Sequence, residues 1–312
     1  MKSSVQLQEI QAAVVRQKGG PFELETLQLD GPRASEVLVR IVATGICATD
    51  IHAHEEHLPM PLPAVLGHEG AGVVERVGSA VTTLKPGDHV VLSQQSCGHC
   101  PQCLRGHPAY CAHVVQLDFA GARLDGTNTM RRSAGAQDGE APRGHFFGQS
   151  SFATYALATE RNAATVPDDM ALELLGPLGC GRGTGAGAVL NALKVGAGSS
   201  LAVFGTGPVG MAAVMAGRAA GAGTIIGVDV VPSRLSLAAA LGATHVIDTR
   251  EQDVQKQIAG ITGAGVDYVV ETTGRPEMGA LAAEVLAPLG TVGLLGTPKP
   301  GVTIPLEPLP LM

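Results

Sequence analysis

The chain lacks any block rich in lysine and arginine, and its formal net charge is −7. Proteins that hold nucleic acid or an anionic membrane by electrostatics need clustered positive charge, so neither is an expected partner. The chain also lacks a continuous apolar segment at its start, and its long uncharged stretch, residues 195–217, is broken by Gly, Ser and Pro. We therefore expect no signal peptide, no membrane span and a cytoplasmic location.

Cysteine is scarce, and its distribution matters more than its number. Four of the six cysteines lie in one short segment. Without an export signal, such crowding favours metal ligation in a reducing compartment over disulfides. The 42 glycines and 20 prolines are dispersed rather than periodic, which excludes a collagen-like or low-complexity chain.

A length of 312 residues exceeds what one hydrophobic core usually supports, so two domains are expected. Residues 1–165 contain short alternating apolar runs between Gly- and Pro-containing connectors, which predicts a β-rich, barrel-like domain. From residue 166 to 312, β-branched runs alternate with Ala- and Leu-rich stretches, which predicts a parallel sheet covered by helices. The five expected strands are residues 201–205, 224–229, 245–248, 266–272 and 291–295, and the helices begin near Val209, Ser233, Asp253 and Glu277.

The cysteine-rich segment places four thiols where one tetrahedral Zn²⁺ can bind them all. These residues are Cys97, Cys100, Cys103 and Cys111. His99 lies within the same loop, but four sulfurs already complete the coordination shell. A disulfide pair or four inert thiols are the alternatives. We expect a structural zinc that holds the loop and performs no chemistry.

The two remaining cysteines, Cys47 and Cys180, could join His68 in a three-ligand set that leaves one zinc position open to substrate. A lone cysteine is more often a small buried hydrophobe, and a lone histidine is more often a hydrogen-bonded core residue. The His-rich stretch 52–57 offers a rival metal cluster, for which a solvated loop is the simpler account. Spacing alone leaves these alternatives open.

The segment Gly205, Gly207 and Gly210 fits the pattern GxGxxG, directly after an apolar strand and at the start of an Ala-rich helix. In that context the glycines permit a tight turn and close approach of a pyrophosphate to the helix N-terminus. Asp229 ends the next strand, about twenty residues later, where a carboxylate can accept from both adenosine ribose hydroxyls. This favours NAD over NADP, and Arg234 is expected to contact the ribose or adenine region.

Taken in order along the chain, these motifs resemble the zinc-containing medium-chain alcohol dehydrogenases. The segment 175–187 most resembles the aryl-alcohol (benzyl alcohol) dehydrogenase branch. The resemblance implies an α/β architecture, in which a GroES-like, β-rich catalytic domain precedes a Rossmann domain with a doubly wound parallel sheet. Five strands of that sheet are visible, and the sixth strand of the family is missing, because the chain ends in a Pro-rich stretch.

The resemblance also assigns roles to residues. It makes Cys47, His68 and Cys180 the ligands of a catalytic zinc, so that the chain would hold two Zn²⁺ and NAD. It implies that Asp50 orients His68 and that Glu69 lies behind the metal. Two further pairs complete the assignment: Thr49 and His52 would carry away the alcohol proton by way of the cofactor ribose, and Thr184 and Val209 would lie near the nicotinamide ring.

The expected reaction is reversible oxidation of a primary alcohol, aromatic or allylic, to its aldehyde. Ser93, Phe146 and Phe147 are expected to line the cleft and leave room for a ring. The alternatives are a polyol, threonine or glutathione-linked formaldehyde dehydrogenase of the same family, or a non-catalytic zinc-binding remnant. The resemblance further implies a homodimer or homotetramer at full length.

Overall fold

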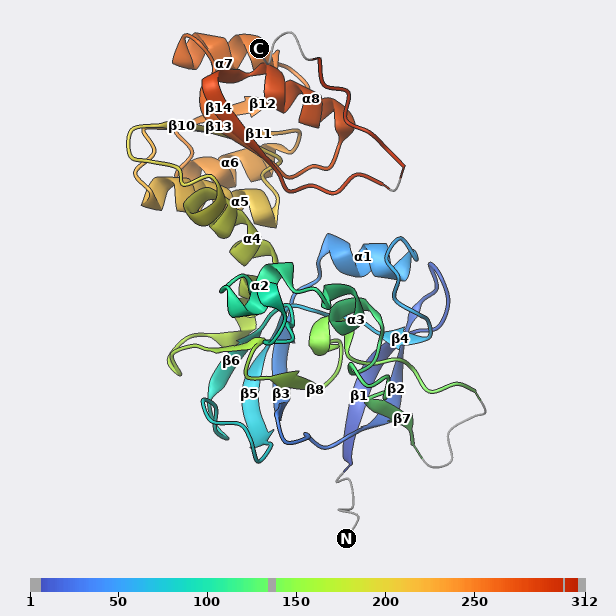
Figure 1. Ribbon diagram of the computed structural model, residues 1–312. Helices are drawn as coiled ribbons and strands as arrows, with labels where there is room; N and C mark the ends of the chain where they lie inside the picture. The colour runs from blue at the N-terminus through green and yellow to red at the C-terminus, as the bar shows by residue number, and fades with distance from the viewer. Residues whose placement is uncertain (1–6, 134–138, 300, 308–312) are drawn as a thin grey trace. The chain divides into compact units, whose positions relative to one another are not determined.

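The computed structural model describes residues 7–133, 139–299 and 301–307, and it divides the chain into two compact units, Met1–Cys180 and Gly181–Met312 (Figure 1). The change of sequence rhythm lies near residue 165, and the segment between that point and Cys180 packs against strands of the first unit. The last five residues of the Pro-rich tail lie outside the described residues. No described helix combines the length and apolar character that crossing a membrane requires.

The first unit contains two antiparallel sheets. One sheet has the strand order β4-β1-β2-β7, with bounds Ala64–Val65, Gln8–Val15, Phe22–Leu29 and Met130–Arg132. The other has the order β8-β3-β5-β6-β9, with bounds Tyr155–Thr159, Glu36–Thr44, Gly70–Val77, His89–Leu92 and Ala163–Thr165. This curled, antiparallel arrangement confirms the expected GroES-like, β-rich domain.

The core of the first unit follows from the two-residue period of its strands. In β1, Ile10, Ala12 and Val14 are buried, while Glu9 and Gln11, on either side of Ile10, are exposed. The buried face packs on Leu27 and its neighbours from β2 and β3. Burying one such side chain contributes about 1.5–3 kcal/mol. The sheets therefore form a rigid base for the loops that leave them.

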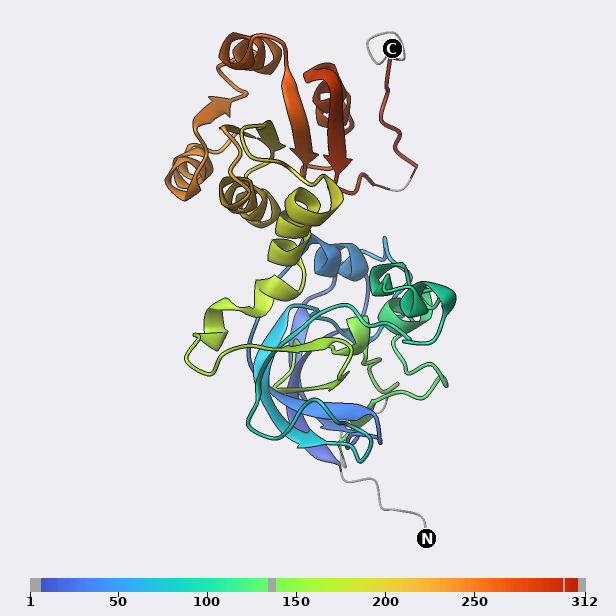
Figure 2. The same ribbon diagram turned by 60° about the vertical axis from the view of Figure 1, so that its left-hand side comes forward.

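Short helices on those loops carry or flank the candidate functional residues. They are α1 (Ala48–His54), α2 (Pro101–Leu104), η1 (Pro108–Tyr110), α3 (Val114–Phe119), η2 (Phe146–Gly148), η3 (Leu172–Leu174) and η4 (Gly176–Gly179). In Figure 2, α1, α2 and α3 lie at the same end of the unit's strands. Cys47 immediately precedes α1, and Cys180 immediately follows η4.

The second unit has a five-stranded parallel sheet of order β12-β11-β10-β13-β14. Its strands span His245–Asp248, Thr224–Asp229, Ser200–Phe204, Val266–Glu271 and Leu286–Leu294. Its helices are α4 (Gly181–Gly187), the π-helix η5 (Ala188–Ala192), α5 (Pro208–Ala219), α6 (Pro232–Leu241), α7 (Val254–Thr262) and α8 (Pro276–Glu284). The expected Rossmann-type architecture is confirmed.

Alternation along β10 shows why this sheet is covered on both faces. Leu201 and Val203 face a core layer with residues of α5 and α6. Ala202 and Phe204 face the opposite layer, which α7 and α8 complete. Each helix begins within a residue of the expected position. Proline occupies the first turn of α5, α6 and α8, where its missing N–H has no partner to lose.

The strand order reverses direction between β10 and β13. In sheets of this kind, ligands bind at the carboxyl ends of the strands on either side of such a switch point. The glycine-rich turn Gly205–Gly210 follows β10 there, at the entrance to α5.

Strand β14 differs from its expected extent, because it begins at Leu286 rather than at residue 291. Pro288 and Gly290 argue against a strand by sequence pattern. The structure accommodates them with a register shift between the Val266 and Tyr268 pairs of β13. Within this irregular part Leu289 adopts a φ of 67° and is fully exposed.

Candidate metal centres and cofactor site

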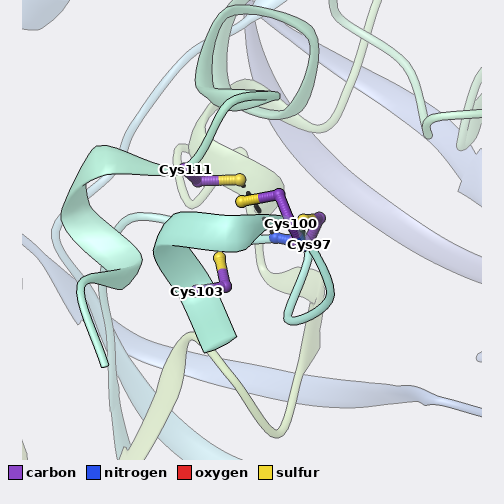
Figure 3. Close-up of side chains that lie close together, drawn as sticks. All are labelled: Cys97, Cys100, Cys103 and Cys111. Atoms are coloured by element: carbon purple, nitrogen blue, oxygen red, sulfur yellow. Dashed lines mark hydrogen bonds between the residues drawn. The ribbon is translucent and has the colours of Figure 1, made fainter. Parts of the chain in front are cut away.

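The four cysteines of the 97–111 segment converge on one point, and their sulfur atoms all lie within 4.8 Å of one another (Figure 3). Their donor set and spacing fit a tetrahedral zinc with four thiolates. All six cysteines of the chain are free rather than paired in disulfides.

Backbone N–H groups prepare these sulfurs for negative charge. Cys97 N donates to Cys111 Sγ at 3.3 Å, and Cys100 N donates to Cys97 Sγ at 3.3 Å. The N–H groups of Ala112 and Cys103 lower the pKa of the Cys100 thiol to about 6. Burial raises the pKa of the Cys111 thiol to about 11. Thiolate is the ligating form, so a bound cation would complete a shell that the backbone already supports.

A second cluster brings together Cys47, His68, Glu69 and Cys180, whose ligand atoms also lie within 4.8 Å of one another. The two sulfur atoms are 3.9 Å apart. Cys180 and Cys47 are 133 positions apart in the sequence, and both belong to the first unit. The structure thus brings together the three expected ligands and places the carboxylate of Glu69 beside them.

Asp50 fixes the orientation of the His68 ring. Both side chains are 1% exposed, and His68 Nδ1 lies 3.0 Å from Asp50 Oδ1. The same carboxylate accepts from Cys47 N at 2.9 Å and from Gly67 N at 3.1 Å. With Nδ1 engaged, His68 presents Nε2 toward the cluster, and that buried nitrogen has no hydrogen-bond partner.

An unpartnered buried nitrogen costs about 1–3 kcal/mol. A metal ion is the natural partner for a nitrogen placed beside two thiols, and two cysteines with one histidine are a known zinc donor set that leaves a position open. The residues of this cluster therefore fit a catalytic zinc.

The local electrostatics place negative charge beside His68. Burial by itself would lower the pKa of His68, but the hydrogen bond to Asp50 and the charge of the neighbouring Cys47 sulfur raise that pKa to about 9. The hydrogen bond between the two thiols lowers the pKa of Cys47 and raises that of Cys180. The protein thus concentrates one negative charge on the Cys47 sulfur.

Glu69 is 4% exposed and lies against Gly45. A Cβ on Gly45 would overlap the Glu69 Oε2 atom and would lie 3.0 Å from its Cδ. Gly176 approaches the backbone of the same residue, and a Cβ there would overlap the Glu69 carbonyl oxygen. The position of this carboxylate therefore depends on two glycines.

Thr49 and His52 lie three positions apart on α1 and therefore share one face of the helix. Thr49 Oγ1 is 3.7 Å from Cys47 Sγ, which places the hydroxyl beside the metal cluster. His52 Nδ1 is 3.3 Å from the Nδ1 of His57, a surface residue. Sequence reasoning placed His57 in a solvated loop and missed this contact.

Two contacts of His68 could not be predicted from the sequence, one with its backbone and one with its ring. Gln149 donates from Nε2 to the His68 carbonyl oxygen at 2.9 Å. Phe147 stacks on the His68 ring, with a centroid separation of 4.6 Å. Phe146 was expected to line the cleft together with Phe147 and Ser93. That expectation is wrong for Phe146, because it is fully buried and belongs to a core cluster with Leu66.

In the second unit, the glycine-rich turn has the geometry that its motif predicts. Gly205 has a φ of 83°, a conformation that side chains with a Cβ rarely adopt. A Cβ on Gly210 would overlap the Gly205 carbonyl oxygen, so this glycine lets α5 pack against the turn. Gly207 is the N-cap of α5. The adjacent cavity has a volume of about 320 Å³, and Gly205, Gly207, Asp229 and Arg234 line it.

Asp229 is 7% exposed, and the chain itself occupies both of its oxygens. Oδ2 accepts from Thr206 N at 2.7 Å, and Oδ1 accepts from Val230 N at 2.7 Å. Arg234 lies 4.0 Å from Oδ2. Arg275, which the sequence did not single out, lines the same cavity. Two guanidinium groups therefore accompany the one carboxylate that lines this cavity.

Thr184 lies on α4, where it is exposed. The next residue, Gly185, packs so tightly on α5 that a Cβ would overlap the Val209 carbonyl oxygen. Thr184 and Val209 are thus on two helices in close contact within the second unit.

Comparison with known proteins adds independent findings. The sequence profile described as "Alcohol dehydrogenase GroES-like domain" matches residues 33–168, and that described as "Zinc-binding dehydrogenase" matches residues 208–312. Geraniol dehydrogenase from Castellaniella defragrans is 47% identical over 304 residues, covering 97% of this chain and 80% of the relative.

Two solved structures are also similar over 98% of this chain and 82% of theirs. An alcohol dehydrogenase zinc-binding domain protein from Burkholderia ambifaria is 54% identical with a TM-score of 0.94. Benzyl alcohol dehydrogenase from Acinetobacter calcoaceticus is 47% identical with a TM-score of 0.92.

Proposed function

Because the chain belongs to the zinc-containing medium-chain alcohol dehydrogenases, we propose that Cys47, His68 and Cys180 bind its catalytic zinc. The protein is an oxidoreductase that interconverts alcohols and carbonyl compounds with zinc and a nicotinamide cofactor. We propose that a second, structural zinc is bound by Cys97, Cys100, Cys103 and Cys111.

The strongest support for the catalytic assignment is the buried Nε2 of His68. This nitrogen has no hydrogen-bond partner, and His68 clusters with the thiols of Cys47 and Cys180. Zinc bound there supplies a Lewis acid that polarises the alcohol or carbonyl oxygen. Asp50 holds the ring by its Nδ1, and Gln149 holds the backbone of the same residue. The carboxylate of Glu69 belongs to the same cluster and is 4% exposed, so it can balance positive charge there.

Thr49 and His52 are the residues proposed to move the proton. Thr49 Oγ1, beside the Cys47 sulfur, accepts the proton that the alcohol loses and passes its own to a hydroxyl of the cofactor ribose. His52 receives the proton from the ribose, and its contact with His57 extends the route to the surface. The contribution of such general acid–base transfer is about 10²–10⁴-fold in rate.

This role is tested by Thr49→Val, which keeps the shape of the side chain but removes its hydroxyl. We expect kcat for alcohol oxidation to fall by about 10²-fold or more, while Thr49→Ser keeps most of it. Metal content, measured in parallel, should stay unchanged in both variants. Full activity in the valine variant would remove Thr49 from the proton route.

The proposed cofactor is NAD, bound at the turn formed by Gly205, Gly207 and Gly210, with Thr184 and Val209 near the nicotinamide. Asp229 supports this choice because a 2′-phosphate would meet its buried carboxylate. To accept a ribose hydroxyl, Asp229 must exchange a hydrogen bond that it now accepts from the backbone. The guanidinium groups of Arg234 and Arg275 would attract a 2′-phosphate. We therefore expect the preference for NAD⁺ over NADP⁺ to be limited. Steady-state kcat/KM for NAD⁺ and NADP⁺ measures it, and an NADP⁺ preference would overturn the choice.

The proposed substrates are primary alcohols with an aromatic ring or an allylic double bond. The names of two relatives, geraniol dehydrogenase and benzyl alcohol dehydrogenase, support this class. Phe147, stacked on His68, adds an aromatic surface at the metal cluster. A flat, unsaturated group can pack on such a ring.

A substrate panel tests the class. Benzyl alcohol and geraniol should each give NAD⁺ reduction with kcat/KM at least about tenfold above that of 1-hexanol, a saturated alcohol close in size to benzyl alcohol. Sorbitol, threonine and S-hydroxymethylglutathione represent the alternative members of the family. Turnover of one of these in preference to benzyl alcohol would replace the proposal. The homodimer or homotetramer stays a prediction.

A further inference from the structure

A third group of metal-binding side chains lies beside the four-cysteine cluster and has no role in the function proposed above. One ligand atom each from Cys97, His99 and His113 lies within 4.8 Å of the other two. His99 comes from the loop between Cys97 and Cys100, and His113 directly precedes α3. The four sulfurs of the neighbouring cluster already complete a tetrahedral shell, so the two imidazoles are surplus to it.

The tautomer of His99 favours metal binding. Its Nδ1 lies 2.9 Å from the Cys97 carbonyl oxygen, which can only accept a hydrogen bond. Nδ1 therefore carries the proton, and Nε2 keeps the lone pair that a metal requires. The rings of His99 and His113 have centroids 5.9 Å apart and are tilted by 38°. His99 is exposed and His113 is half-buried, so an ion in solvent can reach them.

We propose that Cys97, His99 and His113 form a surface site for Zn²⁺, and that zinc enters and leaves the four-cysteine site through it. Two imidazoles and one thiolate are a borderline donor set that suits zinc. Zinc–nitrogen and zinc–sulfur bonds of about 2.0–2.3 Å place the donors of a tetrahedral ion roughly 3.3–3.8 Å apart, which is within the 4.8 Å limit that these atoms satisfy.

The shared ligand is what makes transfer chemically simple. A zinc ion held by Cys97, His99, His113 and one water moves inward by exchanging two Zn–N bonds and one Zn–O bond for three Zn–S bonds, to Cys100, Cys103 and Cys111. The Zn–S bond to Cys97 persists, and the protons of the three entering thiols leave to solvent. No oxidation or reduction is involved. The reverse order returns the metal to the surface site, from which it leaves to solvent, so the ion stays bound to Cys97 throughout the step between the two sites.

Charge favours capture at this position. Four thiolates around one Zn²⁺ carry a net charge of −2, and attraction to a second cation persists over a few ångströms. A thiolate sulfur also has lone pairs for two metal ions. The site can therefore hold an additional Zn²⁺ even while the four-cysteine site is filled, with Cys97 bridging the two ions.

The first experiment counts zinc on the full-length chain by equilibrium dialysis against buffered free Zn²⁺, followed by mass-spectrometric metal analysis. The informative variant is His99→Asn, because the asparagine amide can still donate to the Cys97 carbonyl oxygen but has nothing in place of Nε2. His107→Asn is the matched control, since His107 is exposed in the same segment and belongs to none of the metal groups.

The wild-type chain and His107→Asn should bind one more zinc than His99→Asn, or bind it at least about tenfold more tightly. His113→Ala should behave as His99→Asn does. Equal zinc content and affinity in all four proteins would overturn the site. Because the comparison uses metal content alone, its failure is distinct from a failure of alcohol oxidation.

The second experiment measures exchange. Holoprotein with natural zinc is mixed with zinc enriched in one isotope, and the isotope ratio in the protein is followed after rapid desalting. The pool that belongs to the four-cysteine site should exchange at least about tenfold more slowly in His99→Asn than in wild type and His107→Asn. An unchanged rate would overturn the transfer route. Thermal unfolding of each variant shows whether the loop itself is intact.

Discussion

Asp50→Asn is the most incisive test of the catalytic metal site, because it changes one atom in a buried carboxylate. That carboxylate accepts from Cys47 N, Gly67 N and His68 Nδ1. The asparagine amide must place its NH₂ against one of these donors. If the NH₂ replaces Oδ2, only the bond to Cys47 is lost; if it replaces Oδ1, the other two are lost. The first orientation is therefore expected.

The magnitude follows from that orientation. The N–H of Cys47 is left facing a second donor, which costs about 1–3 kcal/mol. The bond to His68 survives but changes from a charged to a neutral acceptor, which roughly halves its strength. Loss of such support for a ligating histidine typically weakens metal affinity by about 10–100-fold, or about 1.4–2.7 kcal/mol. The two estimates agree in size.

The assay is a competition titration of the bound zinc against a chromophoric chelator. Replacing Zn²⁺ with Co²⁺ allows the two metal sites to be read separately. In Asp50→Asn, the metal affinity of the site formed by Cys47, His68 and Cys180 should fall by about 10–100-fold, while the four-cysteine site keeps its affinity. Turnover should fall with the occupancy of the weakened site. Asp168→Asn, an exposed aspartate in the same unit, controls for the change of net charge. Wild-type affinity at both sites in Asp50→Asn would refute the reasoning.

Three further predictions concern the cofactor turn and the stability of the first unit. Gly210→Ala should raise the Kd for NADH at least about tenfold without changing zinc content, because its Cβ would overlap the Gly205 carbonyl oxygen. Burial lowers the pKa of His145 to about 4, so the fold should lose about 3 kcal/mol as the pH falls from 6.5 to 4, and His145→Asn should lose less. Arg123→Met leaves Glu36 without its 2.6 Å buried partner and should lower the free energy of unfolding by about 3–5 kcal/mol.

Each of these has its own measurement and its own contrary result. Fluorescence titration with NADH should not give equal Kd values for Gly210→Ala and wild type. Urea unfolding at several pH values compares His145→Asn with wild type, and parallel pH profiles would exclude His145 as the cause, since its neutral form is the one the fold favours. For Arg123→Met the control is Arg33→Met, whose ion pair with Asp125 is half exposed and should contribute no more than about 1 kcal/mol.

The second unit was the most predictable part of the fold. Its strands are short β-branched runs, which is the composition expected of strands in a parallel sheet that is covered on both faces. The expected strand 224–229 and the observed β11 coincide. The exception is the start of β14, where Pro288 and Gly290 mask a strand that tertiary pairing nevertheless forms. There the local pattern and the sheet disagreed, and the sheet prevailed.

The four-cysteine cluster could be predicted from the spacing of its thiols, whereas Cys47, His68 and Cys180 were assigned only by resemblance to the family. What the sequence did not reveal is which neighbours support them. Gln149 contacts the backbone of His68 from 81 positions away, and glutamine at an arbitrary position has no recognisable motif. Likewise, Phe146 and Phe147 are indistinguishable as letters, yet one is fully buried and the other stacks on His68. Long-range packing, not local propensity, decides such roles.

The two glycines that face Glu69 have a consequence for anyone wishing to redesign this enzyme. Gly45 and Gly176 leave no room for even a methyl group beside that residue. A saturation library at either position should therefore return glycine almost alone among active clones, however permissive the selection. Gly45 contacts the Glu69 side chain and Gly176 contacts the Glu69 main chain, so a larger residue at either position must displace Glu69. New substrate ranges are therefore expected from residues beside the cluster that are not confined in this way, such as Phe147, which is half-buried and stacks on His68.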